Sequence, residues 1–207
     1  MAMDDAASLE IDLPDRVRLP LPIDPAALAA DLALFSTDDW TPHAVRQNYE
    51  GDWTLLPLRA PAGETHPIRM VYPDPGATAF VDTPLLDRAP YFRAVLGLFK
   101  TRLRNVRLMR LAGGAQIKTH VDGGLDPENG LARIHIPILT GPDVEFLLNG
   151  RPVPMDPGSV WYLRLSDPHS VTNRGGGDRV HLVIDTWTND WLLALLRDAS
   201  SNSSSAK

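Results

Sequence analysis

The sequence predicts a mainly β domain, built as a double-sheet jelly roll with two supporting helices before the sheets and one short helix after them. Three observations lead to this fold class. Short apolar or alternating segments recur at regular spacing from residue 106 onward, as in all-β sandwiches and barrels. Nineteen prolines and fifteen glycines in 207 residues favour many turns. Helical patterns are confined to the first hundred residues and to the C-terminal end.

Three segments carry the signals of a helix. An Asp-Pro pair precedes residues 26–35 and fits an N-cap followed by the first helical residue. A Thr-Pro pair opens residues 83–99, where apolar side chains repeat at helical spacing, so a single helix is expected there. A last helix is expected over residues 190–197.

The other periodic segments predict strands. A strand is expected over residues 53–59, and the proline- and glycine-rich stretch 61–76 is expected to be a loop, with a short strand at 68–71 as an option. Asn149 followed by Gly150 is a strong hairpin signal. The strands expected in the second half of the chain are 106–112, 115–121, 133–139, 144–148, 152–155, 159–165, 171–173 and 180–185.

Length and end composition bound the domain organisation. A chain of 207 residues suits one domain with a substantial core. We expect that domain over residues 1–199, with a catalytic jelly-roll core at about 105–187. The Ser- and Asn-rich residues 200–207 are expected to be a disordered tail.

Charge and cysteine content exclude several function classes. A formal net charge of −6 argues against binding to nucleic acid or an anionic membrane, because both favour basic surfaces. No apolar run reaches the length that a membrane-spanning helix needs. The chain has no cysteine, which excludes disulfides and thiolate metal sites. The acidic first residues lack the apolar core of a signal peptide, so a cytoplasmic location is expected.

Two histidines and one aspartate form a candidate metal site. His120 and Asp122 are two residues apart, and in a strand this spacing places both side chains on one face. Taken alone the pair is weak evidence, because a surface histidine beside a turn-capping aspartate fits it equally well. His169 stands at a predicted strand entry, from where it can reach the first pair. Two imidazoles and one carboxylate leave positions open on an octahedral metal, which suits non-haem iron(II).

Arg179 is the candidate for binding a co-substrate. If residues 174–178 form a five-residue turn between two paired strands, His169 and Arg179 point to the same face, about 13 Å apart at ~3.3 Å per residue. 2-Oxoglutarate that chelates the metal needs a cationic partner for its far carboxylate, and a planar guanidinium meets that need. The alternative is a surface ion pair with Asp178 or Asp185, which typically contributes little.

Five short motifs lie between residues 120 and 185. They are HVD at 120–122, RIH at 133–135, DPGSVW at 156–161, HSVTN at 169–173 and RVHLVID at 179–185. Together they resemble the aspartyl/asparaginyl β-hydroxylase family, whose bacterial branch includes free-proline cis-hydroxylases. The resemblance extends over about residues 53–187. It implies a cupin-type jelly roll, or double-stranded β-helix, that uses iron(II), 2-oxoglutarate and O2 to hydroxylate an unactivated C–H bond.

The resemblance also implies roles for individual residues. The metal ligands would be His120, Asp122 and His169, and Arg179 would bind the C5 carboxylate of 2-oxoglutarate. The animal protein hydroxylases lack the aspartate and the bacterial amino-acid hydroxylases have it, so the chain sides with the bacterial group and a small substrate is expected. Further candidates are Arg133 and His135 for contact with the co-substrate, although they lie farther from His120 than in the animal enzymes, and Asn48, Tyr49, Trp53 and His181 for contact with the substrate.

The sequence therefore predicts a 2-oxoglutarate-dependent dioxygenase acting on an amino acid, a peptide residue or a related small molecule, with succinate and CO2 as products. Two alternatives stay open. A cupin metalloenzyme that does not use 2-oxoglutarate would have no need of Arg179. A non-catalytic cupin-like module that binds a small acid would consume no O2. Neither the substrate nor the oligomeric state follows from the sequence.

Overall fold

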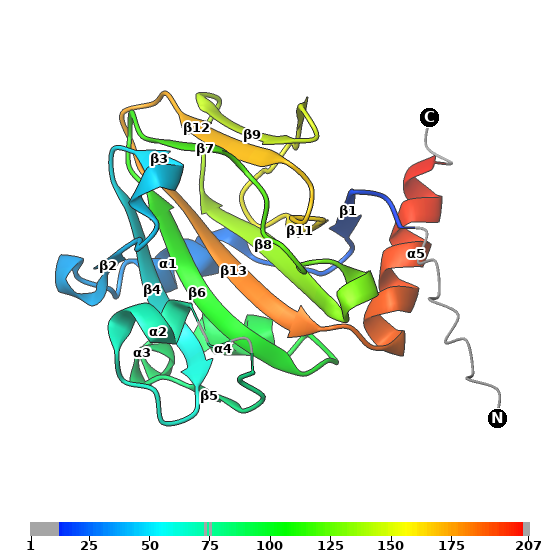
Figure 1. Ribbon diagram of the computed structural model, residues 1–207, viewed down its shortest axis with the longest axis horizontal. Helices are drawn as coiled ribbons and strands as arrows, with labels where there is room; N and C mark the ends of the chain where they lie inside the picture. Colours follow the sequence, from blue (N-terminus) through cyan, green and yellow to red (C-terminus); the bar gives the residue numbers. More distant parts are fainter. Residues whose placement is uncertain (1–12, 73, 75, 205–207) are drawn as a thin grey trace, which may run out of the picture.

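Two antiparallel β-sheets form the body of the molecule in a computed structural model, which describes residues 13–72, 74 and 76–204 (Figure 1). The large sheet contains, in spatial order, β1 (Arg16–Leu19), β11 (Val160–Leu163), β8 (Leu131–Leu139), β13 (Arg179–Trp187), β6 (Leu103–Leu111), β4 (Trp53–Pro61) and β2 (Thr41–Pro42), with β5 (Phe80–Asp82) beside β4. The small sheet contains β10 (Arg151–Pro152), β9 (Val144–Leu148), β12 (His169–Asn173), β7 (Gln116–His120) and β3 (Tyr49–Glu50). The mainly β fold class is confirmed.

Most of the helices cover the face of the large sheet that is turned away from the small sheet, whereas the short helix at residues 67–71 lies on the opposite face, beside the core between the sheets. The helical elements are α1 (Pro25–Leu32), α2 (Pro67–Val71), α3 (Pro84–Asp87), α4 (Pro90–Leu96) and α5 (Asp190–Ser204), with 3-10 turns η1 (Thr37–Asp39), η2 (Arg46–Asn48) and η3 (Pro127–Asn129). Leu28 of α1 and Phe92 of α4 are fully buried in a core with Leu108 and Leu182 of the sheet. A second core lies between the two sheets and includes Leu55.

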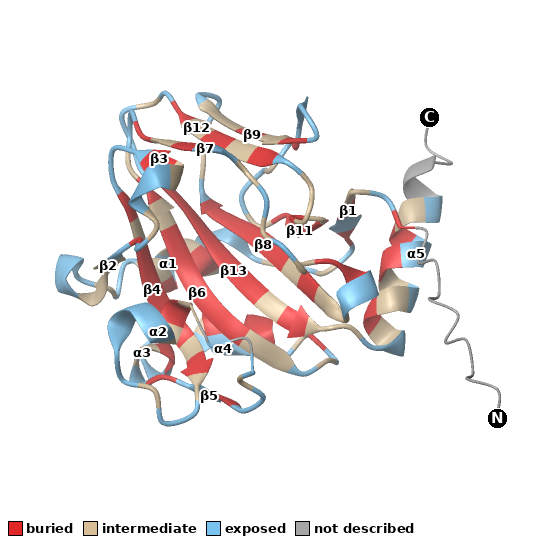
Figure 2. Ribbon diagram, viewed as in Figure 1, coloured by how far each residue is buried: buried red, intermediate tan, exposed pale blue. Residues whose placement is uncertain are grey.

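Strand β13 contributes side chains to both cores, the one beneath the helices and the one between the sheets. Its even-numbered residues, such as Leu182, belong to the core beneath the helices. Because side chains alternate along a strand, its odd-numbered residues from Arg179 to Asp185 point to the space between the sheets. The strand is buried over most of its length, like its neighbours β6 and β8 (Figure 2). Polar side chains on these odd-numbered positions therefore face a protein interior and require partners there.

The two helices before the core differ in how well the sequence predicted them. The Asp24 carboxylate accepts hydrogen bonds from Ala26 N and Ala27 N, which confirms the predicted N-cap of α1, although the helix ends at Leu32. The single helix predicted over 83–99 is wrong. Two short helices, α3 and α4, occupy that range because Pro90 lacks the N–H that a continuous helix would need and instead begins the second one.

Two other local predictions also need correction. Residues 67–71 form the helix α2 and not a strand, and Pro67 occupies its first turn, where a missing N–H costs nothing. The Asn149-Gly150 hairpin is confirmed, with both residues at positive φ (52° and 69°) as a tight hairpin turn requires. Its second strand, β10, is shorter than predicted and covers only Arg151–Pro152.

The predicted hairpin between 171–173 and 180–185 is wrong. Strand β12 pairs with β7 and β9 in the small sheet, whereas β13 pairs with β6 and β8 in the large one. The segment between them therefore crosses from one sheet to the other. The buried Asn173 amide fixes this crossover by donating to Leu111 O, Ala112 O and Gly177 O. Gly113 is needed beside it, since a Cβ there would lie 2.6 Å from Gly175 O.

The C-terminal helix α5 is longer than predicted. It runs from Asp190 to Ser204, and its side chains Leu192 and Leu196 are fully buried against the large-sheet core. Residues 200–204, which were expected to belong to a disordered tail, are thus helical, and residues 205–207 lie outside the described part. No helix within the described ranges is both long and apolar enough to span a bilayer.

Candidate metal centre and cavity

The three predicted metal ligands lie together at one end of two neighbouring inner strands of the small sheet. Strand β7 ends at His120 and strand β12 begins at His169, and the register of the two strands sets these residues opposite each other. Asp122 follows directly after β7. One ligand atom from each of the three side chains lies within 4.8 Å of the other two. Within the described ranges, no other group of three or more His, Asp or Glu side chains meets that condition.

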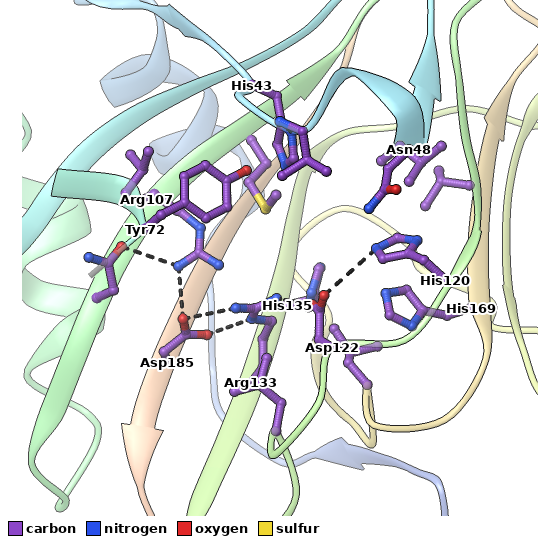
Figure 3. A pocket seen from close by; sticks show the side chains of 18 of the residues that line it. His43, Asn48, Tyr72, Arg107, His120, Asp122, Arg133, His135, His169 and Asp185 are labelled. Carbon is purple, nitrogen blue, oxygen red and sulfur yellow. Dashed lines mark hydrogen bonds and ion pairs between the residues drawn. The ribbon is translucent and has the colours of Figure 1, made fainter. Parts of the chain in front are cut away.

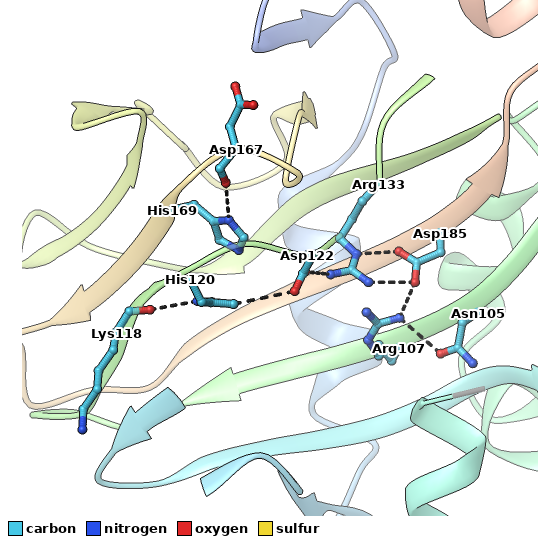
Figure 4. A network of polar contacts seen from close by, with 9 residues as sticks. All are labelled: Asn105, Arg107, Lys118, His120, Asp122, Arg133, Asp167, His169 and Asp185. Atoms are coloured by element: carbon cyan, nitrogen blue, oxygen red, sulfur yellow. Dashed lines mark hydrogen bonds and ion pairs between the residues drawn. The ribbon is translucent and has the colours of Figure 1, made fainter. Parts of the chain in front are cut away.

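Backbone carbonyls orient both imidazoles toward this site. His120 Nδ1 lies 2.8 Å from Lys118 O, and His169 Nδ1 lies 3.0 Å from Asp167 O (Figure 4). A carbonyl oxygen only accepts, so Nδ1 must carry the proton in both rings. Each Nε2 then presents a lone pair, which is the form of histidine that binds a metal. Burial lowers the pKa of His169 to about 4, so this ring is neutral at physiological pH.

The Asp122 carboxylate is held by a chain of buried charges. Its Oδ2 accepts from Arg133 Nη1, while its Oδ1 lies 3.8 Å from His120 Nε2. The guanidinium of Arg133 also donates to both oxygens of Asp185, and Asp185 Oδ2 accepts a further bond of 2.9 Å from Arg107 (Figure 4). Burial acts to lower the pKa of Arg133, but Asp185 and Asp122 outweigh it and hold that pKa above its ordinary value.

Arg179 is buried without a carboxylate partner among the described residues. Its side chain is 2 % exposed, and burial lowers its pKa to about 9. Its Nη2 donates to His181 Nδ1 over 2.8 Å, and its Nε has no partner. The surface pairing with Asp178 or Asp185 is thus absent. A buried guanidinium that lacks a counter-ion is costly, so this position favours an anion.

A cavity of about 490 Å³ joins the predicted metal ligands to Arg179. Figure 3 shows His120, Asp122 and His169 on one side of it, with Tyr72, Arg107 and His43 across from them. The lining includes Asn48, Trp53, Arg133 and His135 of the predicted site residues.

Two predicted substrate contacts lie elsewhere. Tyr49 is buried in the core between the sheets, where its hydroxyl donates to His43 O. His181 lies behind Arg179 and lines a second cavity of about 550 Å³ together with that arginine. The ring of His181 therefore contacts the guanidinium and not the main cavity.

The sequence did not reveal four residues of this cavity as site candidates. The cavity is lined by Arg107, His43 and Tyr72. Asp185 lines it as well, although the sequence suggested this residue only as a surface ion-pair partner for Arg179. A signal for Asp185 exists in the sequence, since it shares the odd-numbered phase of Arg179 on one strand. Nothing comparable marks His43 or Tyr72, which reach the cavity from irregular segments and a short helix.

Comparison with known proteins gives two kinds of match. Residues 33–189 match the model of a family described as aspartyl/asparaginyl beta-hydroxylase. Among solved structures, the chain is similar to a 2OG-Fe(II) oxygenase family oxidoreductase from Burkholderia pseudomallei, with 18% identity over 84% of this chain and 85% of that chain and a TM-score of 0.51. It is also similar to SnoN, a non-heme alpha ketoglutarate dependent epimerase from nogalamycin biosynthesis, with 11% identity over 87% and 81% of the two chains and a TM-score of 0.53. At such identities the likeness concerns the fold.

Proposed function

The chain belongs to the aspartyl/asparaginyl β-hydroxylase family, and on that premise we propose that it is an iron(II)- and 2-oxoglutarate-dependent dioxygenase. Its substrate would be an amino acid, a peptide residue or a related small molecule that carries an unactivated C–H bond. The single observation that carries the proposal is one cavity holding both the His-Asp-His cluster and a buried arginine without a counter-ion.

The donor set fits iron(II). His120 and His169 each offer a neutral Nε2, and Asp122 offers Oδ1, so three ligands leave further positions for other molecules. Iron(II) bound there would supply the oxidative chemistry by which 2-oxoglutarate, O2 and a substrate C–H bond are converted to succinate, CO2 and a hydroxylated substrate, with one oxygen atom of O2 in the succinate and the other in the hydroxylated substrate. The protein's own part is to hold the ligands. Arg133 does this for Asp122, because its bond to Oδ2 leaves Oδ1 directed to the site.

Arg179 is suited to the far carboxylate of 2-oxoglutarate. A planar guanidinium binds a carboxylate through two parallel hydrogen bonds. Arg179 Nη2 donates to His181 Nδ1, which holds the guanidinium in one orientation. Its Nε has no partner and is free to donate to a bound carboxylate. His135 stands close by with a buried Nε2 that also lacks a partner. In this proposal Arg179, with His135 beside it, binds the co-substrate, whereas Arg133 holds the Asp122 carboxylate in place.

Succinate release tests the proposal directly. The purified protein is incubated with iron(II), 2-oxoglutarate and O2 and a panel of free amino acids and short capped peptides. We expect iron-dependent succinate formation that one class of panel member stimulates, with formation of a hydroxylated product. His66 is exposed and outside the cavity, so His66→Ala is a matched control for His120→Ala. Equal succinate release from both variants, or release that does not require iron, would overturn the proposal.

A further inference from the structure

The charges that line the main cavity do not balance. Within the described residues, six charged side chains line it: Arg104, Arg107, Arg133 and Arg179 against Asp122 and Asp185. Iron(II) would add two positive charges and 2-oxoglutarate two negative ones, so the loaded cavity retains two positive charges in excess. This local excess stands in a chain whose formal net charge is −6. Since buried charge without compensation is costly, the excess favours an anionic substrate.

The excess is located on Arg107 and Arg104, away from the metal ligands. Arg107 is 3 % exposed and shares the single charge of Asp185 with Arg133. Both of its side-chain hydrogen bonds, to Asp185 and to Asn105, leave from Nη1. Its Nε and Nη2 thus remain for a ligand. Arg104 lies over the rings of Phe80 and Trp187 and pairs with no carboxylate of the described residues.

The neutral polar groups beside Arg107 are mostly donors. His43 Nδ1 accepts from Val45 N, so this ring carries its proton on Nε2. The Tyr72 hydroxyl is buried without a partner, and Figure 3 shows it between Arg107 and His43, directed into the cavity. Trp53 Nε1, a group that only donates, is also buried without a partner, and its indole stacks on His43 with 3.5 Å between ring centroids.

We propose that Arg107, together with Tyr72 and His43, forms a subsite for a carboxylate of the substrate, on the side of the cavity opposite the metal ligands. This inference rests on the proposed function and specifies its substrate class. The substrate is a carboxylic acid whose anionic group docks on Arg107 and whose C–H bond is thereby presented toward His120 and His169. The carboxylate can come from a free amino acid or from an acidic side chain of a peptide, and the chemistry of recognition is the same.

Matched acid and amide pairs test the subsite without turnover. Zinc(II) is redox-inert, so the protein loaded with zinc(II) and 2-oxoglutarate can be titrated calorimetrically. The free pairs are L-aspartate with L-asparagine and L-proline with L-prolinamide. The peptide pair is N-acetyl-aspartyl-N-methylamide with its asparaginyl counterpart. We expect the acid of at least one pair to bind on the order of ten-fold tighter than its amide, the usual scale of a hydrogen bond to a charged group.

Two substitutions locate the preference. Arg107→Gln should abolish the acid-over-amide preference, whereas Arg107→Lys should keep a weaker one. Arg110 lies on the same strand but in the opposite phase, over the Trp40 ring, so Arg110→Gln is the matched control and should leave the preference intact. Thermal unfolding of each variant shows whether it is folded.

The outcomes also separate this inference from the proposed function. Amides that bind as tightly as acids, a panel that does not bind at all, or an unchanged preference in folded Arg107→Gln would overturn the subsite. Acid-selective binding that Arg107→Gln abolishes, without any succinate release from the iron-loaded protein, would support the subsite and contradict the oxygenase proposal.

Discussion

The two sheets contribute different chemistry and hold it by different means. The small sheet supplies His120 and His169, and each ring is oriented by a backbone carbonyl two residues before it in the chain. The large sheet supplies Arg179, Arg133 and Asp185, and side-chain contacts orient these groups: Arg133 and Asp185 bond across two neighbouring strands, and Arg179 bonds to His181 of its own strand. The orientation of each imidazole in the small sheet thus depends on backbone within two residues of it. The positions of the charged groups in the large sheet depend on contacts between several side chains. Substitutions should therefore separate metal binding from anion binding.

The largest effect is expected in the small sheet. His169→Ala removes one of the three proposed ligands, so iron(II) affinity should fall by at least about 100-fold and activity with it. Anaerobic equilibrium dialysis against iron(II) measures the affinity, with His66→Ala as the control. Retention of full iron binding by a folded His169→Ala variant would show that the cluster is not the metal site.

Arg179→Ala tests the large sheet alone. Loss of a buried charge-assisted carboxylate contact typically costs 2–5 kcal/mol, so KM for 2-oxoglutarate should rise on the order of 100-fold while iron(II) affinity stays the same. Steady-state kinetics with varied 2-oxoglutarate measure this. The exposed Arg174, which pairs with Glu145, provides the control Arg174→Ala. Unchanged turnover in Arg179→Ala would favour a metalloenzyme that does not use 2-oxoglutarate.

Arg133 connects the two regions, so its effect should be intermediate. Arg133→Gln frees Asp122 from its partner, and we expect iron(II) affinity to fall by about 10-fold, the lower end for loss of a residue that orients a ligand. Arg133→Lys should restore part of it. If instead KM for 2-oxoglutarate rises while iron(II) affinity is unchanged, Arg133 contacts the co-substrate, as the family resemblance implied.

The last prediction concerns stability against pH, where no effect on metal or anion binding is involved. Burial lowers the pKa of His43 to about 3 and holds those of His135 and His181 well below the ordinary value. The unfolded chain therefore binds more protons below about pH 6.5, and the free energy of unfolding should fall as pH is lowered, by up to ~1.4 kcal/mol per pH unit for each ring.

Urea unfolding of the metal-free protein between about pH 7.5 and about pH 5 measures this slope, a window above the carboxylate titrations. The variant His181→Leu, which removes one of the three rings, should show a smaller slope than the parent protein. An unchanged urea midpoint across the window would show that these rings are not buried in their neutral form.

The sequence predicted the grouping of His120 with Asp122 because that part of the site depends on local geometry. Period-two alternation places His120 and Asp122 on one face, and a strand entry brings His169 opposite them. Arg179 reached the cavity although the predicted hairpin was wrong, because the crossover after Asn173 sends the next strand into the facing sheet. Which residues meet across two sheets is decided by strand pairing, and periodicity carries no information on it.

The network of Arg133, Asp185 and Arg107 was missed for the same reason. These residues come from three different strands, and only the registers of β13 with β8 and β6 bring them together. The break of the predicted helix at Pro90 was a different kind of error. The missing N–H is visible in the sequence, but the helical spacing of the apolar residues on both sides of Pro90 favours one continuous helix.

The central claim is that one metal ion held by the small sheet and one guanidinium of the large sheet bind the same molecule of 2-oxoglutarate. Anaerobic equilibrium dialysis with labelled 2-oxoglutarate tests this directly, with and without iron(II). We predict one 2-oxoglutarate retained per protein with iron(II), and sharply reduced retention without iron(II) or in Arg179→Ala. Equal retention by the parent protein and Arg179→Ala, or binding that is independent of iron(II), would contradict the account.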